Sequence, residues 1–247
     1  MIQCRSLTRR FGEYLAVNAL NLEVPSGSIC AFLGPNGAGK STTVKMLTGL
    51  LAPSAGQATV CGVDVGRDPL EVRRISGTVP EHLGLFESLT VAEHLRLTGD
   101  VWGLPPRETG RRSDELLAAL SLEHGARTFA GECSHGMRKK TALAMALLPN
   151  PRALFLDEPF EGIDPVTSKT IRELLRMLAA RGVTIFLTSH ILSIVEEIAT
   201  QVVFIRQGEK VWDSPPAGLP AASLEAHYFD LVEAPVPQEL TWLGLSR

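Results

Sequence analysis

The chain has 247 residues, of which 45% are hydrophobic, so it is long and apolar enough to bury a full core. A formal net charge of −3 gives no electrostatic reason to expect nucleic acid as a partner, and without a run of about 18 apolar residues no segment is expected to cross a bilayer as a helix. Residues 1–12 lack the apolar stretch of a secretory signal and the four cysteines show no metal-pairing pattern, so we expect reduced thiols in a cytosolic protein.

Strands and helices are expected to alternate along most of the chain. Two segments before about residue 65 have the pattern of antiparallel strands, which predicts an N-terminal antiparallel β subdomain. A buried strand at 28–34 is followed by a glycine-rich turn and a short helix. Further buried strands are predicted at 153–157 and 183–189, with a helix at 166–182 between them. This alternation predicts an α/β fold with a mostly parallel sheet, whose ligands bind at the carboxyl ends of the strands.

The middle of the chain has a different character. Its apolar residues recur with a helical period, so we predict a helical subdomain at about 83–150 that is inserted into the α/β core. After residue 210 the chain is rich in Pro and Ala before a short helical stretch at 224–232. We therefore expect one domain over residues 1–210 and a short C-terminal tail over 211–247, with little catalytic role for the tail.

The segment GPNGAGKS fits the pattern G-x-x-x-x-G-K-[ST] and lies between a predicted buried strand and a predicted helix. Glycines there let successive backbone N–H groups converge on phosphate oxygens, and the N-terminus of the helix adds partial positive charge. We expect Lys40 to reach the β- and γ-phosphates, Ser41 to bind Mg²⁺ and Thr42 to bond an α-phosphate oxygen. The predicted nucleotide-binding residues of this loop are Gly34, Pro35, Asn36, Gly37, Ala38, Gly39, Lys40, Ser41 and Thr42.

A pair of carboxylates should complete such a site at the end of a second buried strand. The segment ALFLDEP supplies them as Asp157 and Glu158. We expect Asp157 to hold Mg²⁺, directly or through water, and Glu158 to orient or deprotonate the attacking water. The two motifs together predict a P-loop nucleoside triphosphatase.

From its start to about residue 210 the sequence strongly resembles the ATP-binding cassette (ABC) family. The segment CSHGMRKK, at 133–140, resembles the signature motif of that family, usually written LSGGQ. Ser134 and Gly136 match the positions that the family ties to nucleotide contact, whereas His135 and Met137 depart from the usual form. A serine at a helix N-cap and a glycine that allows close backbone approach suit a helix start directed at phosphate.

Further matches to the family fall in chain order. The segment EGIDP resembles the D-loop, with Asp164 at the acidic position, and His190 matches the switch histidine, for which the resemblance implies contact with the γ-phosphate. Phe11 stands where the family places an aromatic ring that stacks on adenine, with Tyr14 as the competing candidate. The segment TVPEHLGLF resembles the Q-loop, except that Glu81 replaces the glutamine. Glu81 can still bind Mg²⁺ and contact nucleotide, but it adds negative charge beside the γ-phosphate.

The resemblance implies a function as well as a fold. In the family, two cassettes face each other head to tail and enclose two ATP molecules, so we expect a homodimer or a pair with a similar subunit. The expected partner is an integral membrane permease, which the chain would serve from the inner face of the cell membrane, and the form of the motifs is closer to exporters than to importers. We expect the permease to dock around residues 80–104, at Phe86 first.

One alternative function remains: a soluble ABC ATPase that acts on nucleic acid or ribosomes. Repair-type members carry long coiled-coil or zinc-bearing insertions, whereas here only residues 42–133 separate Ser41 from Ser134, without a CxxC pair. Translation-type members carry two cassettes in one chain, and this chain carries one. The transporter ATPase is therefore the favoured interpretation, on analogy rather than on fold.

Overall fold

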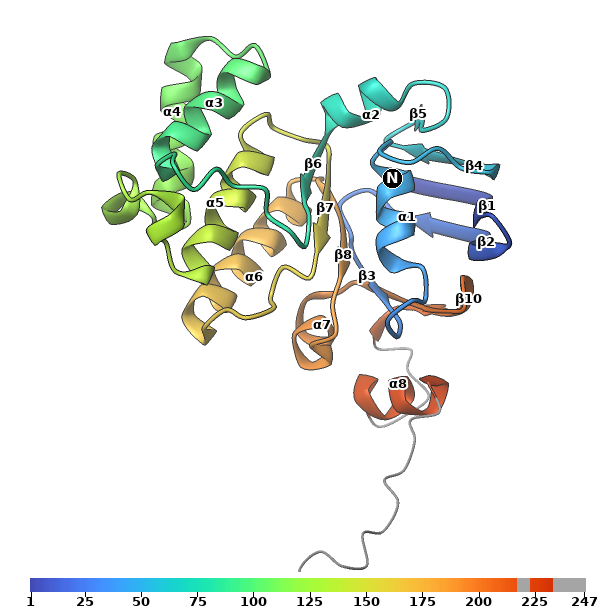
Figure 1. The fold of residues 1–247 in the computed structure, drawn as a ribbon. Coiled ribbons are helices and arrows are strands. Elements are labelled where there is room, and N and C mark those ends of the chain that lie inside the picture. The colour runs from blue at the N-terminus through green and yellow to red at the C-terminus, as the bar shows by residue number, and fades with distance from the viewer. Residues whose placement is uncertain (217–222, 233–247) are drawn as a thin grey trace, which may run out of the picture.

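The computed structural model describes residues 1–216 and 223–232, and its centre is a six-stranded sheet (Figure 1). The strand order is β10-β9-β3-β8-β7-β6. Five strands pair in parallel, and β10 pairs with β9 in the antiparallel sense. The strands are β3 (Ile29–Leu33), β6 (Ser76–Val79), β7 (Ala153–Asp157), β8 (Thr184–Thr188), β9 (Gln201–Arg206) and β10 (Glu209–Ser214). The predicted α/β fold with a mostly parallel sheet is confirmed.

Helices cover both faces of this sheet, which explains why its central strands are apolar throughout. In β3, Ala31 and Leu33 face one hydrophobic core, whereas Cys30 and Phe32 face the other, as the two-residue period of a strand requires. The first core contains α5 (His135–Leu147), α6 (Pro165–Ala180) and α7 (Leu192–Ile198). The second contains α1 (Lys40–Leu47) and α2 (Pro69–Ile75).

The N-terminal part forms a separate antiparallel sheet beside α1 (Figure 1). Its strand order is β2-β1-β4-β5. The strands are β1 (Ile2–Phe11), β2 (Tyr14–Val24), β4 (Ala55–Val60) and β5 (Val63–Asp64). This sheet is the predicted antiparallel β subdomain, and its inner face completes the second hydrophobic core.

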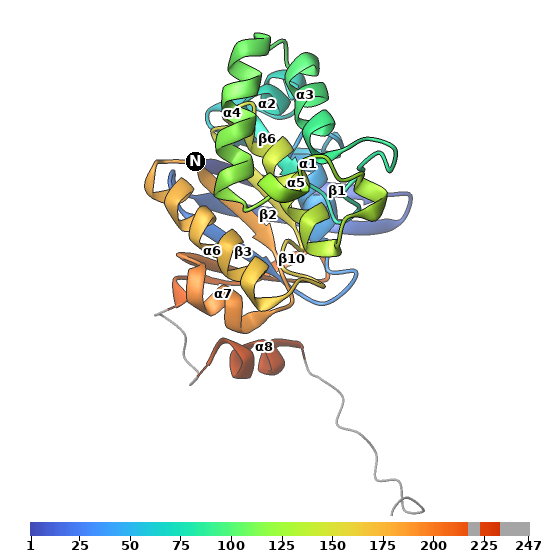
Figure 2. The same cartoon turned by 90° about the vertical axis from the view of Figure 1, so that its left-hand side faces the viewer.

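The inserted helical subdomain lies on the side of the molecule opposite to this sheet (Figure 1) and faces the viewer, with α4 and α3 at the top, in Figure 2. It consists of α3 (Val91–Val101), α4 (Pro106–Ala119), two short 3-10 helices, Glu123–Gly125 and Ala130–Glu132, and the start of α5. A capping box explains where α3 begins: Thr90 accepts from the backbone N–H of Glu93, and the Glu93 carboxylate accepts from the backbone N–H of Thr90.

The C-terminal part contributes to the core more than the sequence suggested. The boundary expected at residue 210 falls inside β10, so the sheet continues to Ser214. Helix α8 (Leu224–Val232) then packs back on the sheet, with Leu224 fully buried and the ring of His227 in contact with the rings of Phe204 and Trp212. Among the described residues, no helix has both the length and the apolar composition needed to cross a membrane.

Candidate functional site

The predicted site residues from three separate segments meet at one edge of the six-stranded sheet. The glycine-rich loop follows β3, the two carboxylates end and follow β7, and His190 follows β8. These strands run in parallel register, with Thr188 paired to Phe32 on one side and to Asp157 on the other. The carboxyl ends of parallel strands share one edge, so residues far apart in the sequence come together there.

The glycine-rich loop has a backbone path that only glycine allows. At Gly34, a Cβ atom would lie 2.2 Å from the carbonyl oxygen of Ile205, and at Gly39 it would lie 2.4 Å from that of Ala16. Gly39 also has a left-handed φ of 106° and stands as the N-cap of α1 without a side-chain cap. The first N–H groups of α1 are thus left for a ligand, and the cradle has the form that a phosphate chain requires.

Lys40 lies inside this cradle. Its ammonium group donates to the carbonyl oxygens of Gly34, at 2.7 Å, and Pro35, at 3.2 Å. Burial lowers the pKa of Lys40, whereas the charges of Glu158, Asp157 and Glu81 act in the opposite direction. The ammonium therefore sits between the loop and the carboxylates, which is the place where a nucleotide's phosphates would need a cation.

The two carboxylates have different surroundings. Asp157 is buried and accepts from the hydroxyl of Thr188. Glu158 has a left-handed φ of 50°. In this conformation its backbone N–H donates to Thr188 at 3.1 Å. A left-handed backbone costs energy in a residue with a side chain, and here the bond to Thr188 helps to hold it.

The carboxyl group of Glu158 is turned toward His190. Its Oε2 atom accepts from the backbone N–H of His190 at 3.2 Å and lies 2.9 Å from Nδ1 of the ring. Burial raises the pKa of Glu158, and His190 and Lys40 oppose the rise. A carboxylate with a raised pKa and a fixed orientation has the properties of a general base.

The signature segment lies at the start of α5. Ser134 is its N-cap, and the Ser134 hydroxyl accepts from the backbone N–H of Met137 at 3.2 Å. Gly136 packs against the start of α6, where a Cβ atom would lie 3.1 Å from Oγ1 of Thr167. Asp164 caps α6 by accepting from the backbone N–H groups of Val166 and Thr167. The hydrogen bonds with Thr167 lower the pKa of Asp164 most. Asp164 thus acts here as a helix cap.

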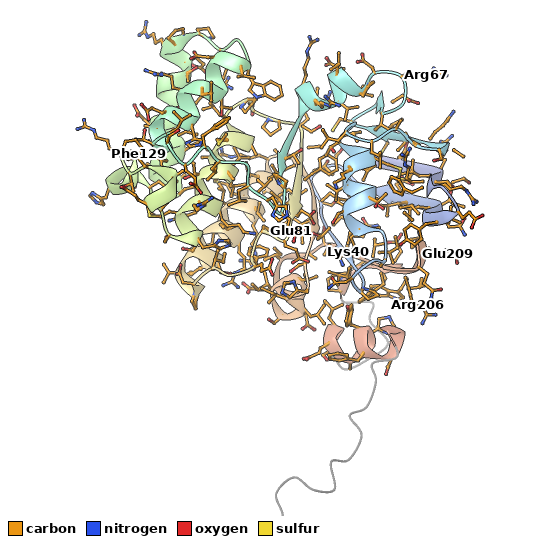
Figure 3. All side chains as sticks on the ribbon, viewed as in Figure 1. Lys40, Arg67, Glu81, Phe129, Arg206 and Glu209 are labelled. Carbon is orange, nitrogen blue, oxygen red and sulfur yellow. The ribbon has the colours of Figure 1, made fainter. Side chains whose placement is uncertain are left out.

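The remaining predicted contacts lie at the rim of the site. Phe11 is 46% exposed, with the guanidinium of Arg9 4.5 Å from its ring centroid. Its competitor Tyr14 contacts the glycine-rich loop directly, because its hydroxyl donates to the carbonyl oxygen of Gly37 at 3.1 Å. Glu81 is exposed, and Figure 3 shows it near Lys40, consistent with its effect on the pKa of that lysine.

Two residues of the site were not predicted from the sequence. Thr188 bridges Asp157 and the backbone of Glu158, and the buried ammonium of Lys139 donates to the carbonyl oxygen of Glu158. A threonine at a strand end carries no distinctive signal. Lys139 lies within the signature segment, and a lysine on the buried face of a predicted helix was the signal that could have revealed it.

Comparison with known proteins gives consistent results. The family model described as ABC transporter matches residues 17–161. The chain is 37% identical over 216 residues to the bacitracin transport ATP-binding protein BcrA of Bacillus licheniformis, covering 87% of this chain and 70% of that protein. It is 38% identical over 226 residues to the Nod factor export ATP-binding protein I of Rhizobium sp. (strain N33), and the match covers 92% of this chain and 73% of that protein. A solved ATP-binding subunit of an ABC transporter superposes with a TM-score of 0.85 at 32% identity, covering 94% of this chain and 99% of that one.

Proposed function

The chain belongs to the ABC transporter family, and on this premise we propose how its residues hydrolyse ATP and what the hydrolysis drives. It is an ATP-binding ATPase subunit of that family. We propose that it serves an exporter, because the relatives BcrA and Nod factor export protein I are named for transport or export. The observation that supports the proposed hydrolysis of ATP is the convergence of the glycine-rich loop, Lys40 and the Glu158–His190 pair at one sheet edge.

The proposed mechanism assigns one task to each of these residues. Residues 34–42 hold the phosphates, and Lys40 leaves the carbonyl oxygens of its own loop for the β- and γ-phosphates. Glu158 takes a proton from the water that attacks the γ-phosphorus, and the bond to the β-phosphate oxygen breaks to give ADP and phosphate. His190 donates to Glu158, which keeps the carboxylate directed toward that water. Phe11 or Tyr14 stacks on the adenine.

The donor set of the site fits Mg²⁺. Ser41, Asp157 and Glu81 offer hard oxygen atoms, as this ion prefers. In the described part of the chain, no three His, Cys, Asp or Glu residues are grouped as a metal site. A Mg²⁺ ion completes its six ligands with substrate phosphates and water, so it needs few from the protein. When bound, it neutralises phosphate charge.

We infer that two cassettes pair when ATP binds. The glycine-rich loop leads into α1 on one face of the sheet, whereas the signature leads into α5 on the other face. Ser134 is exposed at the start of α5. A second cassette, related by a two-fold axis, can bring its own Ser134 and Gly136 to the nucleotide of the first. The partner is a second copy or a similar subunit.

The docking surface for a membrane-spanning permease is proposed at a groove of about 440 Å³ between β6, α3 and α5. Phe86 lines this groove and is 58% exposed, and Leu50, Leu97 and Val101 add further exposed apolar area. Such a groove suits a short helix of the permease with an apolar face. The chain would then act at the inner face of the cell membrane, and its ATPase domain would include all of β10, to Ser214.

Phosphate release by the purified chain tests this function. We expect hydrolysis of ATP in the presence of Mg²⁺, and we expect Glu158→Gln to lower kcat about 100-fold or more, because the amide cannot take the proton. Turnover by Glu158→Gln at the rate of the wild type would remove Glu158 from its proposed role.

A further inference from the structure

One face of α5 carries two side chains that reach the catalytic loop, residues 158–164, which joins β7 to α6 and carries Glu158. His135 and Lys139 are four residues apart, so they lie one above the other on the helix. The ammonium of Lys139 donates to the carbonyl oxygen of Glu158, and Nε2 of His135 lies 3.2 Å from the carbonyl oxygen of Glu161. Because a carbonyl oxygen can only accept, Nε2 of His135 carries the proton.

Lys139 is an unusual residue for a helix interior. It is only 3% exposed, and burial lowers its pKa. The charges of Glu161, Glu158, Asp157 and Glu81 act in the opposite direction and favour the ammonium form. A buried ammonium is costly unless it is hydrogen-bonded and close to negative charge, and the loop after β7 supplies both conditions.

The loop and the start of α5 are also closely packed against each other. A Cβ atom on Gly162, which has a left-handed φ of 68°, would lie 3.2 Å from the ring of His135. A Cβ atom on Gly136 would lie 3.1 Å from Oγ1 of Thr167 and 3.4 Å from Oδ2 of Asp164. Because interiors packed this closely transmit displacement, we expect a shift of the helix to displace the loop.

We propose that His135 and Lys139 form a clamp that ties the signature helix to the catalytic loop and positions Glu158 for hydrolysis. The clamp rests on the proposed role of Glu158 as general base. Lys139 holds the carbonyl group of Glu158 itself, and His135 holds the loop three residues farther on. When a second cassette engages Ser134 at the start of α5, the same helix transmits that contact to Glu158 of its own chain. The clamp thus links the signature of each cassette to its own catalytic centre.

The test replaces Lys139 by methionine, which keeps the length of the buried side chain and removes its ammonium. We expect kcat for ATP hydrolysis to fall about tenfold or more, whereas KM for ATP changes less than about threefold, because the clamp orients the base and does not touch the nucleotide. The combined His135→Ala and Lys139→Met variant should lose less than the product of the two single losses, since both side chains hold one loop.

Lys140→Met is the matched control. Lys140 is a second buried lysine of α5, and its charge interacts with that of Asp164. Its ammonium lies 3.4 Å from the carbonyl oxygen of Ser121, however, and unlike Lys139 it does not donate to the carbonyl oxygen of Glu158. We expect this variant to keep kcat near that of the wild type. A Lys139→Met protein with the kcat of the wild type, or with a loss that Lys140→Met matches, would overturn the clamp.

Two further results also bear on the clamp. If circular dichroism shows that Lys139→Met does not fold, the test is made with His135→Ala, because His135 is exposed and its replacement should not disturb folding. A fall in kcat of about threefold or more in His135→Ala supports the clamp, and an unchanged kcat overturns it. If Glu158→Gln keeps full turnover, the proposed function of the site has failed. If Glu158→Gln is inactive while Lys139→Met turns over normally, only the clamp has failed.

Discussion

The carboxyl group of Glu158 is subject to opposing effects on its ionisation. Burial raises its pKa, and this effect exceeds the lowering by His190 and Lys40. The ionised form must take the proton from water, so hydrolysis fails as the pH falls through the raised pKa. We therefore predict that the acid limb of the kcat profile lies above about 4.3, the ordinary pKa of a glutamate.

This prediction is checked by phosphate release at saturating ATP over a series of pH values. The titratable groups that interact with the carboxyl group of Glu158 are Lys40, Lys139, His190 and Tyr228. Binding of an ATP analogue to Glu158→Gln serves as the control and should vary little over the same range. An acid limb centred at pH 4 or below would show that burial does not control this carboxyl group.

Lys40→Ala tests whether the glycine-rich loop binds the nucleotide. The ammonium of Lys40 is the charged side chain held inside the loop, and loss of its charge-assisted bonds to two phosphates removes about 3 kcal/mol, or about 100-fold in Kd. A labelled ATP analogue in the presence of Mg²⁺ gives the Kd directly. Unchanged affinity would mean that residues 34–41 are not the nucleotide site.

Individual site residues differ in how well the sequence predicts them. The loop at 34–41 is a contiguous motif, and its glycines are needed for local reasons that a pattern can express. The contacts of Thr188, Lys139 and Tyr14 are made across the fold, between segments whose spacing carries no pattern. For the adenine side, the sequence favoured Phe11, whereas the structure adds a direct contact of Tyr14 with the loop.

Among the elements, the segment between β6 and α3 carries the docking prediction. The backbone N–H of Phe86 donates to Nε2 of the buried His94 at 3.0 Å, which fixes the backbone while the side chain stays 58% exposed. We predict that Phe86→Asp weakens assembly with the membrane-spanning permease about tenfold or more and leaves ATP hydrolysis by the free chain unchanged. Co-purification with the permease and phosphate release are measured side by side.

Phe129→Asp is the control for this variant. Phe129 belongs to the same subdomain (Figure 3) and is 46% exposed. It does not line the groove. It should therefore assemble normally. If Phe86→Asp assembles as well as Phe129→Asp, docking occurs elsewhere, and if it abolishes hydrolysis, Phe86 supports the core.

At the level of elements, apolar runs predicted the buried strands because strands covered on both faces are hydrophobic throughout. The end of the domain was harder to predict. Strand β10 is an edge strand whose residues are mostly exposed or half-buried, so its sequence resembles a loop. The core position of α8 depends on Phe204 and Trp212, which belong to earlier strands, and no local pattern in 224–232 shows that contact.

For the whole molecule, the sheet separates the two helix starts that we propose to contact nucleotide. The core around α1 and the core around α5 draw alternate residues from the same strand β3, so the two helices lie on opposite faces. One chain would therefore engage a given nucleotide through its glycine-rich loop, and a second chain would supply Ser134. In the proposed pair, the ATP molecule would be part of the interface, and its hydrolysis would weaken that interface.

A variant that binds ATP without hydrolysing it should accumulate the paired state. We predict that Glu158→Gln forms a dimer with ATP and Mg²⁺ and remains a monomer with ADP, because only the triphosphate reaches the signature of the partner. Light scattering after gel filtration gives the mass of each state. Adding Lys40→Ala to Glu158→Gln should abolish the dimer, because the ligand that joins the chains is no longer bound, and Ser134→Arg should abolish it while ATP binding to the monomer persists. A Glu158→Gln dimer that forms equally well with ADP, or that survives Ser134→Arg, would mean that the chains pair through another surface.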